Sequence, residues 1–228
     1  PHVKKGITTL ELNQIAEEYM LKVQKSYPAP LTKGFPKAIC TSVNHVICHG
    51  IPSNSKKLKD GDIIGIDVSL EYDGYFGDTC KMYTVGKPSI KAKRVIQVCQ
   101  EALYKAIRLV KPGTSLKAIG ACIQQHVEAN RYSVVREYCG YGIGDQLHED
   151  DFNVLHYDAP NVPDIKLEAG LTFTIEPMVN IGAADTKLMP DNWTVITKDR
   201  SLSAQWEHTI LVTNDGYEVL TLRPEEKI

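Results

Sequence analysis

Two aspartates in one predicted hairpin are the first residues of this sequence whose types and spacing could do chemistry. The segment IDVSLEYDGYFGDT reads as two strands joined by the Asp-Gly dipeptide at positions 73–74, which a two-residue type I′ turn prefers. Such a turn pairs Asp67 with Cys80 and Asp78 with Ser69, so the two aspartates become diagonal neighbours on one sheet face, about 7–8 Å apart at the backbone. Two carboxylates this close repel each other unless a proton or a cation lies between them. The pattern fits a cation site, and it also fits a solvated polar face of the sheet.

Two glutamates extend this set of acids. Glu176 lies in LTFTIEPMV and Glu207 lies in SAQWEHTILVT. Both segments are rich in strand-forming residues, so we predict both side chains in strand interiors, where glutamate is uncommon and an unpaired buried charge is costly. Four acids on apolar strands from three segments favour a shared oxygen-rich site, which suits hard divalent metals.

The composition is that of an ordinary globular protein and argues against several classes of function. Among 228 residues, 26 Lys and Arg stand against 28 Asp and Glu, and the resulting net charge of −2 argues against a nucleic-acid surface. We expect no membrane partner, because no apolar run reaches the length of a membrane span. The six cysteines include no CxxC pair and lie mostly in apolar periodic segments, which favours reduced thiols and a cytoplasmic protein.

The elements that must position the acids alternate between helices and strands. Thr8 and Glu11 match a capping box that opens a helix ending near Val23. Further helices are predicted at 95–110 and 114–129. Strands are predicted at 39–48, 63–85 (the hairpin), 171–179, 193–197, 203–213 and 217–222. Mostly antiparallel strands with interleaved helices indicate an α+β fold, and we expect a single domain over residues 1–228 because no stretch reads as a linker.

Four stretches of the chain closely resemble type I methionine aminopeptidases. They are SVNHVICHGIP (42–52), GDIIGIDVSLEYDGYFGDTCKMY (61–83), FTIEPMV (173–179) and SLSAQWEHTILVT (201–213), in family order and at family spacing. The resemblance implies the pita-bread fold, in which two pseudo-symmetric halves place helices outside a curved antiparallel sheet. It also implies a metalloaminopeptidase that removes N-terminal methionine at a dinuclear metal site.

The resemblance also implies the metal ligands. Asp67, Asp78, Glu176 and Glu207 fall on four of the family's five ligand positions. The fifth ligand of the family is a histidine in a GHGIG motif, and this sequence has GYGIG, with Tyr141 in that place. We therefore expect two divalent ions, from among Co, Mn, Fe, Zn and Ni. One of the two sites should be weak, because a phenol binds metal strongly only after losing a proton whose pKa is about 10.

The family's substrate residues are matched by position as well. His49 in CHG and His148 in LHED fall on its two substrate-contacting histidines, and Glu176 is implied as the group that takes a proton from the attacking water. The same positions, together with a pocket for the methionine side chain, define the implied substrate-binding residues: His49, His148, Cys40, Phe35, Leu147 and Trp193.

Two functions from different classes remain open from the sequence. The first is a methionine aminopeptidase that acts as a monomer on peptide or nascent-chain N-termini, with ribosome association implied by the resemblance. The second is a catalytically impaired or inactive pita-bread protein that binds peptides or partners. Four retained acids and both histidines favour the first function. Tyr141, and a loop at Asp150-Asp151 that looks one residue longer than in the family, favour the second.

Overall fold

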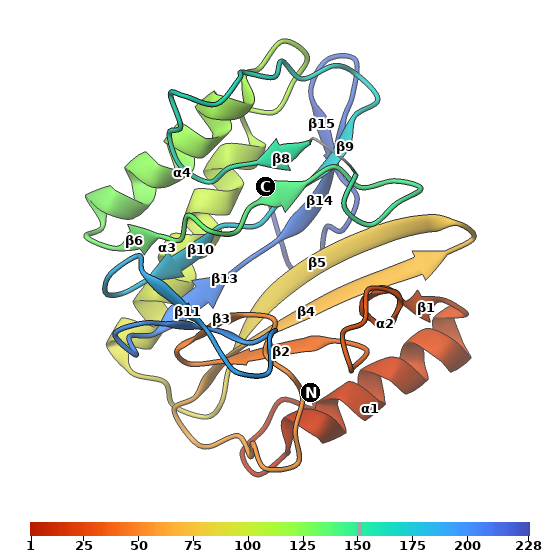
Figure 1. Cartoon of the computed structure of the whole chain (residues 1–228), viewed down its shortest axis with the longest axis vertical. Coiled ribbons are helices and arrows are strands. Elements are labelled where there is room, and N and C mark those ends of the chain that lie inside the picture. The colour runs from red at the N-terminus through yellow and green to blue at the C-terminus, as the bar shows by residue number, and fades with distance from the viewer. Residues whose placement is uncertain (150–151) are drawn as a thin grey trace.

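The hairpin predicted around the Asp-Gly turn is the longest strand pair of the fold (Figure 1). A computed structural model describes residues 1–149 and 152–228, so the altered loop at Asp150-Asp151 lies outside the described residues. The hairpin consists of Ile63–Tyr72 (β4) and Tyr75–Thr84 (β5). The two turn residues between them have positive φ, 52° and 83°, as a type I′ turn requires.

The register of this hairpin is the predicted one. Asp67 pairs with Cys80, and Asp78 pairs with Ser69. Because side chains alternate between the faces of a strand, this register puts both aspartates on one face. The local turn therefore sets the register that places the first two acids of the site on one face.

The first helix covers the outer side of the hairpin sheet. Thr9–Tyr19 (α1) begins at the predicted capping box: the Thr8 backbone N–H donates to Glu11 Oε2 at 2.7 Å, and the Glu11 N–H donates to Thr8 Oγ1 at 3.1 Å. A π-helical turn, Met20–Gln24 (η1), extends it to about the predicted end. The buried side chains between this helix and the sheet are Leu12, Val43, Leu58, Ile64 and Val85.

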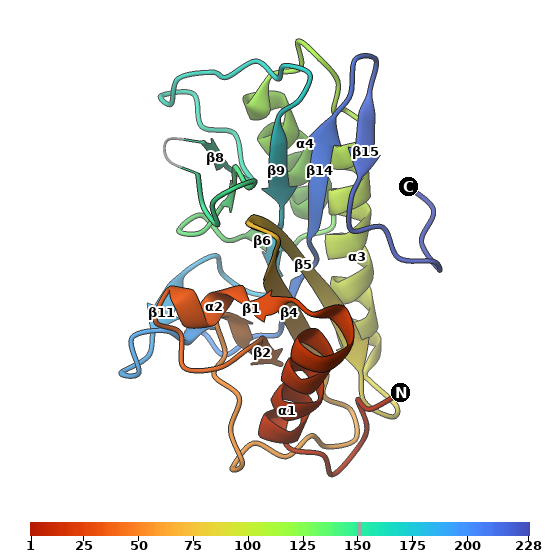
Figure 2. The same cartoon turned by 90° about the vertical axis from the view of Figure 1, so that its right-hand side faces the viewer.

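Two longer helices cover the other half of the molecule (Figure 2). Ile90–Ile107 (α3) and Leu116–Ala129 (α4) begin at Ser89 and Ser115, whose side chains accept backbone hydrogen bonds from the first turn. The second of these helices matches the prediction. The first begins five residues earlier than predicted, because its first turn is mostly exposed and shows little apolar periodicity. No helix within the described residues is both long and apolar enough to cross a membrane.

The remaining elements are short, and every strand pair is antiparallel. Beside the hairpin lie Tyr27–Pro28 (β1), Ala29–Thr32 (α2) and Cys40–Val43 (β2). One small sheet consists of Val46–Cys48 (β3), Thr186–Leu188 (β11) and Val195–Thr197 (β12). A second consists of Ser133–Val134 (β6), Met178–Asn180 (β10) and Ser203–Gln205 (β13). A third consists of Gly140–Tyr141 (β7) and Asn153–Val154 (β8). The last sheet contains Thr172–Ile175 (β9), His208–Val212 (β14) and Tyr217–Val219 (β15).

The predicted strand 39–48 is broken at Asn44-His45, between β2 and β3. The two predicted strands that carry glutamates are also each broken by two residues. The predicted strand 171–179 divides at Glu176-Pro177, and the predicted strand 203–213 divides at Trp206-Glu207. The prediction that both glutamates occupy strand interiors is therefore wrong. Pro177 has no N–H to donate to a ladder, which accounts for the break at Glu176-Pro177.

The two breaks at the glutamates lie opposite each other. On one side Ile175 pairs with His208, and on the other side Met178 pairs with Gln205. The residues between these pairs, including both glutamates, therefore stand at the same level of the sheet. The large apolar core beneath is formed mainly by α3, α4 and these strands.

Candidate metal centre

Three carboxylates converge where the hairpin meets the strand break at Trp206-Glu207. Asp67 comes from β4, Asp78 from β5, and Glu207 from the break between β13 and β14. Each offers one oxygen within 4.8 Å of the others, a spacing at which the three could hold one metal ion. Asp78 and Glu207 are only 3% and 1% exposed, which is unusual for acids.

One oxygen of each carboxylate has no hydrogen-bond donor. Asp67 Oδ1, Asp78 Oδ1 and Glu207 Oε1 are buried and unpaired within residues 1–149 and 152–228. A buried acceptor without a donor costs about 1–3 kcal/mol, and more when it is charged. A divalent cation with oxygen ligands would remove this cost at all three atoms. The donor set therefore fits a hard divalent metal.

The charged forms of these acids are unfavourable in the protein alone. Burial, and then the negative charge of Asp78, raise the pKa of Asp67, Glu176 and Glu207 well above the ordinary range. The cluster therefore retains protons in the absence of a cation. Binding of a cation would release them.

Glu176 lines the same cavity from the strand break at Glu176-Pro177, but it lies outside the 4.8 Å group. Its Oε1 accepts a hydrogen bond from Thr174 Oγ1 at 3.0 Å, and its Oε2 accepts one from Gln205 Nε2 at 3.1 Å. Its backbone N–H donates to Nε2 of the buried His156 at 3.2 Å. Gln205 was not predicted as a site residue, because its contact with Glu176 depends on the pairing of β10 with β13.

Tyr141 extends from β7 into the carboxylate cluster. Its hydroxyl donates to Asp78 Oδ2, which also accepts from Ser69 Oγ at 2.8 Å. Burial, and then the neighbouring carboxylates, raise the pKa of this hydroxyl well above its usual value. Tyr141 is therefore a neutral donor here, and its ring meets the His148 ring edge to face with centroids 4.1 Å apart.

Both predicted substrate histidines line the cavity and have unusual backbone conformations. The φ angles of His49 and His148 are 52° and 66°. This left-handed region costs a non-glycine residue about 1–3 kcal/mol and recurs at functional sites. Burial lowers the pKa of both imidazoles, so each is neutral near pH 7 and offers one N–H donor.

The residues predicted for a side-chain pocket line this same cavity, whose volume is about 90 Å³. Phe35 and Trp193 meet edge to face with ring centroids 5.3 Å apart. Cys40 and Leu147 are buried, and burial raises the pKa of the Cys40 thiol, which argues against a nucleophile. The other lining residues are Pro30, Lys33, Ser69 and Gln205. Of these, Ser69 could have been identified from the sequence, because the predicted register places it opposite Asp78.

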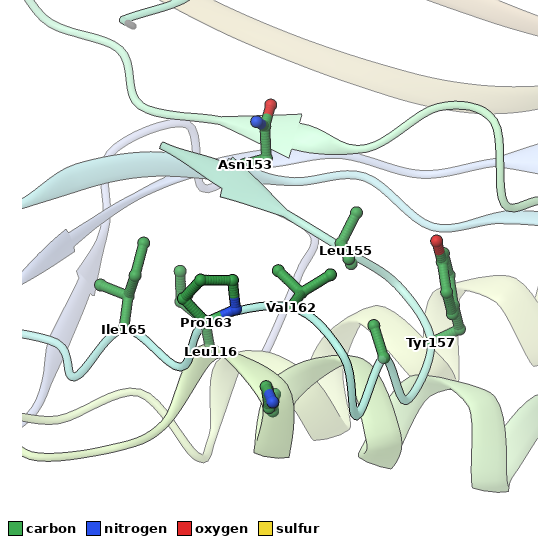
Figure 3. Close-up of a pocket in the computed structure, with 9 residues that line it drawn as sticks. Leu116, Asn153, Leu155, Tyr157, Val162, Pro163 and Ile165 are labelled. Atoms are coloured by element: carbon green, nitrogen blue, oxygen red, sulfur yellow. The ribbon is translucent and has the colours of Figure 1, made fainter. Parts of the chain in front are cut away.

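A second cavity, of about 150 Å³, lies between α4 and the segment that follows β8 (Figure 3). Its lining is mainly aliphatic, and Leu116, Val162 and Ile165 are among the side chains around it. No carboxylate or imidazole belongs to that lining among the described residues. The chemistry-bearing side chains are therefore gathered in the first cavity.

Comparisons of sequence match nearly the whole chain. The sequence model of Metallopeptidase family M24 matches residues 1–214. Methionine aminopeptidase of Escherichia coli (strain K12) is 54% identical over 229 residues, covering 100% of this chain and 86% of that protein. Methionine aminopeptidase of Haemophilus influenzae is 52% identical over 228 residues, covering 99% and 84%.

Comparisons of structure agree with the sequence matches. Methionine aminopeptidase from Rickettsia prowazekii superposes with a TM-score of 0.92 at 50% identity, covering 97% of this chain and 88% of that one. The Thermotoga maritima methionine aminopeptidase superposes with a TM-score of 0.92 at 37% identity, with the same coverage of both chains. The prolidase from Pyrococcus horikoshii gives 0.74 at 24% identity, covering 100% of this chain and 57% of that one, which is a likeness of fold alone.

Proposed function

Because the chain belongs to metallopeptidase family M24, we propose that it is a metal-dependent aminopeptidase that removes N-terminal methionine from peptides and nascent proteins. The same comparisons confirm the expected pita-bread fold. The observation that carries the proposal is the group of Asp67, Asp78 and Glu207, whose buried oxygens have no donor among the described residues. Such a group is stable as carboxylates only with a cation.

Asp67, Asp78, Glu176 and Glu207 would hold two divalent ions drawn from Co, Mn, Fe, Zn and Ni. Such ions, when bound, lower the pKa of water and polarise the scissile carbonyl. The unpaired oxygens of the cluster support the first three assignments, and the shared cavity supports Glu176. Tyr141 occupies the position that the resemblance gives to a histidine ligand. One of the two metal sites would therefore be weak.

Glu176 is assigned the proton transfer. Burial, and then the charge of Asp78, raise the pKa of Glu176 well above its ordinary value, which makes this carboxylate a better proton acceptor. The hydrogen bonds from Thr174 and Gln205 hold both of its oxygens in place. The base is thereby oriented before the substrate arrives.

His148 and His49 are assigned the carbonyl oxygen and the peptide nitrogen of the substrate. Each is a neutral imidazole on a constrained backbone at the cavity wall. A fixed N–H donor stabilises an oxygen that gains negative charge during attack, and this effect can be worth about 3–4 kcal/mol. Cys40, Phe35, Leu147 and Trp193, which line the same cavity, would accept the first side chain.

Site residues come from both halves of the chain, between Phe35 and Glu207, which supports one catalytic domain over residues 1–228. All six cysteines are free, which supports a cytoplasmic protein, and the resemblance supports a monomer that acts on nascent chains, with ribosome association.

A second candidate is favoured by one specific contact. The Tyr141 hydroxyl donates a hydrogen bond to one oxygen of Asp78. After burial, the charge of Asp78 is the largest cause of the raised pKa of the other three carboxyl groups. If this hydrogen bond persists when metal is added, the protein would bind peptides without cleaving them.

A paired measurement separates these candidates. Metal-stripped protein is titrated with Mn²⁺ by calorimetry, and the same preparation is assayed for methionine release from Met-Ala-Ser. We expect Mn²⁺ binding and Mn²⁺-dependent release, both lost in Asp67→Asn and Glu207→Gln. Asp73→Asn, in the turn of the same hairpin, is the control and should retain both. Binding without release supports the second candidate, and absence of binding overturns the metal-dependent function.

A further inference from the structure

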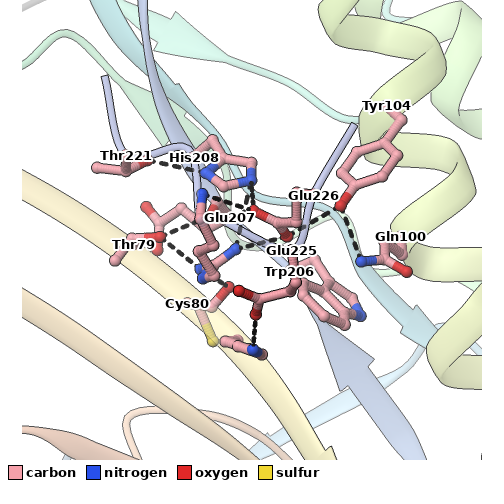
Figure 4. A network of polar contacts seen from close by, with 12 residues as sticks. Thr79, Cys80, Gln100, Tyr104, Trp206, Glu207, His208, Thr221, Glu225 and Glu226 are labelled. Carbon is pink, nitrogen blue, oxygen red and sulfur yellow. Dashed lines mark hydrogen bonds and ion pairs between the residues drawn. The ribbon is translucent and has the colours of Figure 1, made fainter. Parts of the chain in front are cut away.

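A network of polar contacts surrounds the Glu207 backbone and involves the C-terminal segment of the chain (Figure 4). Its central residues are Arg223 and Glu226, with side chains only 14% and 4% exposed. Neither of them lines the cavity that holds the acids. Buried charges are costly unless they are paired and hydrogen-bonded, and the proposed reaction uses neither residue directly.

Arg223 binds the strand that carries Asp78 just beyond that residue. Its Nη2 donates to Thr79 Oγ1 at 2.6 Å and to the Cys80 carbonyl at 3.0 Å. The same two groups also fix the backbone of Glu207: its N–H donates to the Cys80 carbonyl at 3.0 Å, and its carbonyl accepts from Thr79 Oγ1 at 2.9 Å. One guanidinium nitrogen thus closes a ring of hydrogen bonds between the two segments that supply Asp78 and Glu207.

Glu226 holds the guanidinium in this position. Its Oε1 accepts from Arg223 Nη1 at 2.9 Å and from the hydroxyl of Tyr104 on α3 at 2.9 Å. The guanidinium also lies over the Trp206 ring, 5.6 Å from its centroid. Such a fork depends on the planar geometry of arginine, which lysine cannot reproduce.

Thr221, in the same C-terminal segment, makes a second hydrogen-bonded connection toward the acids. Its Oγ1 accepts the backbone N–H of Thr209 at 3.0 Å. Thr209 Oγ1 in turn donates to the Asp78 carbonyl at 2.8 Å and accepts from the Asp78 N–H at 3.2 Å. Hydrogen bonds therefore link the C-terminal segment, through intervening residues, to the backbone of both Asp78 and Glu207.

We propose that Arg223 and Glu226 are positioning residues, which set the separation of the Asp78 and Glu207 carboxylates and so determine metal affinity. This inference rests on the proposed function, because it requires a metal at that cluster. Outer hydrogen-bond partners of metal ligands typically change metal affinity by about 10–100-fold when they are altered. A role in stability alone would change the melting temperature but not the affinity of the folded protein.

The test compares Mn²⁺ affinity with the stability of the metal-free protein. Arg223→Lys keeps the charge and loses the fork, and we expect it to bind Mn²⁺ about 10-fold more weakly in calorimetry. Methionine release should fall at low Mn²⁺ and recover at saturating Mn²⁺. Glu226→Gln, which keeps the shape of the side chain, should weaken Mn²⁺ binding in the same direction.

Two control variants separate positioning from stability. Glu225 lies in the same C-terminal segment, and Glu225→Gln removes its exposed ion pair with Lys81. This variant should leave Mn²⁺ affinity unchanged. Ile119→Val, in the core on α4, should lower the melting temperature and leave affinity unchanged.

The outcomes distinguish the inference from the function on which it rests. If the wild-type protein binds no Mn²⁺, the proposed function itself fails. If the wild-type protein binds Mn²⁺ and both network variants bind it equally well, the positioning role is overturned. The same conclusion follows if Ile119→Val weakens binding as much as Arg223→Lys does. If Arg223→Lys does not fold, Glu226→Gln decides between these results.

Discussion

The two carboxylate oxygens of Asp78 differ in their hydrogen bonding. Oδ2 already accepts hydrogen bonds from Ser69 and Tyr141, whereas Oδ1 has no donor among the described residues. A metal ion bound between the acids would compete with the Tyr141 proton for this carboxylate. The identity of residue 141 should therefore affect how strongly the carboxylates bind metal.

Replacing Tyr141 by histidine should strengthen metal binding and catalysis together. A neutral imidazole ligates transition metals near pH 7, whereas the buried phenol keeps its proton. We expect Tyr141→His to raise Mn²⁺ affinity and the rate of Met-Ala-Ser cleavage by about 10-fold or more. Tyr141→Phe serves as the comparison, because it removes the hydrogen bond without supplying a ligand. No gain in either quantity for the histidine variant would show that residue 141 limits neither metal binding nor activity.

The side-chain pocket should still prefer methionine, but with weak discrimination. Phe35 and Trp193 form an aromatic corner, and Leu147 leaves more room than a ring would at its position. One contact of methylene size is worth about 1–3 kcal/mol in discrimination. We expect methionine to lead in kcat/KM, with leucine and norleucine peptides following within about 100-fold. Equal values of kcat/KM for peptides that begin with lysine or aspartate would contradict this assignment.

Residue types and motif positions identified side chains that the fold brings together, and their assigned roles stay predictions. Each of the predicted acids, histidines and pocket residues lines one cavity. Gln205 and Pro30 were missed for a physical reason: a glutamine in a strand and a proline beside a short helix have no distinctive pattern until the chain has folded. Their roles depend on neighbours that are far away in the sequence.

At the scale of elements, sequence patterns within a few residues predicted the hairpin register and a helix start correctly. Features that depend on contacts between distant residues were not predicted. The hairpin register followed from the Asp-Gly turn, and the α1 start followed from a capping box within four residues. The breaks at positions 176–177 and 206–207 were not predicted, because the alternation of side chains continues across them. Only the pairing of distant strands reveals that each break turns a glutamate toward the acids of the hairpin.

The turn of the hairpin offers a direct test of this local control. Gly74 has φ of 83°, a conformation that an alanine adopts only with strain, so Gly74→Ala should cost about 1 kcal/mol of unfolding free energy. Gly77→Ala, three residues further on in β5, is the matched control, because an added Cβ there meets nothing within 4 Å and φ is ordinary. Urea denaturation of both variants measures the difference. Equal losses of stability would show that the positive φ does not govern the turn.

At the scale of the whole molecule, metal binding and stability should be linked through pH. Burial raises the folded-state pKa of Asp67, Glu176 and Glu207, so their contribution to stability is present below the unfolded pKa of about 4 and is lost as pH rises. A bound cation removes this loss by stabilising the ionised forms. The metal-free protein should therefore gain more from metal at higher pH.

We expect the rise in melting temperature on adding Mn²⁺ to increase between about pH 5.5 and about pH 8. Taking the difference between samples with and without metal reduces the contribution of groups outside the cluster, such as His156, whose pKa burial lowers to about 3. Scanning calorimetry at three pH values provides the measurement, with Asp67→Asn as the control that should flatten the trend. A rise that is the same at every pH would contradict the linkage.

The ring of hydrogen bonds between the hairpin and the C-terminal segment also bears on how the chain acquires its activity. Asp67 and Glu207 are far apart in sequence, and Arg223 follows still later. Contacts at such separation form late in folding, because a long loop must close before they contribute. The first half of the chain can therefore form its hairpin during synthesis without being able to capture metal. Metal uptake should coincide with the final docking of the C-terminal segment, so that partly synthesised chains remain without peptidase activity.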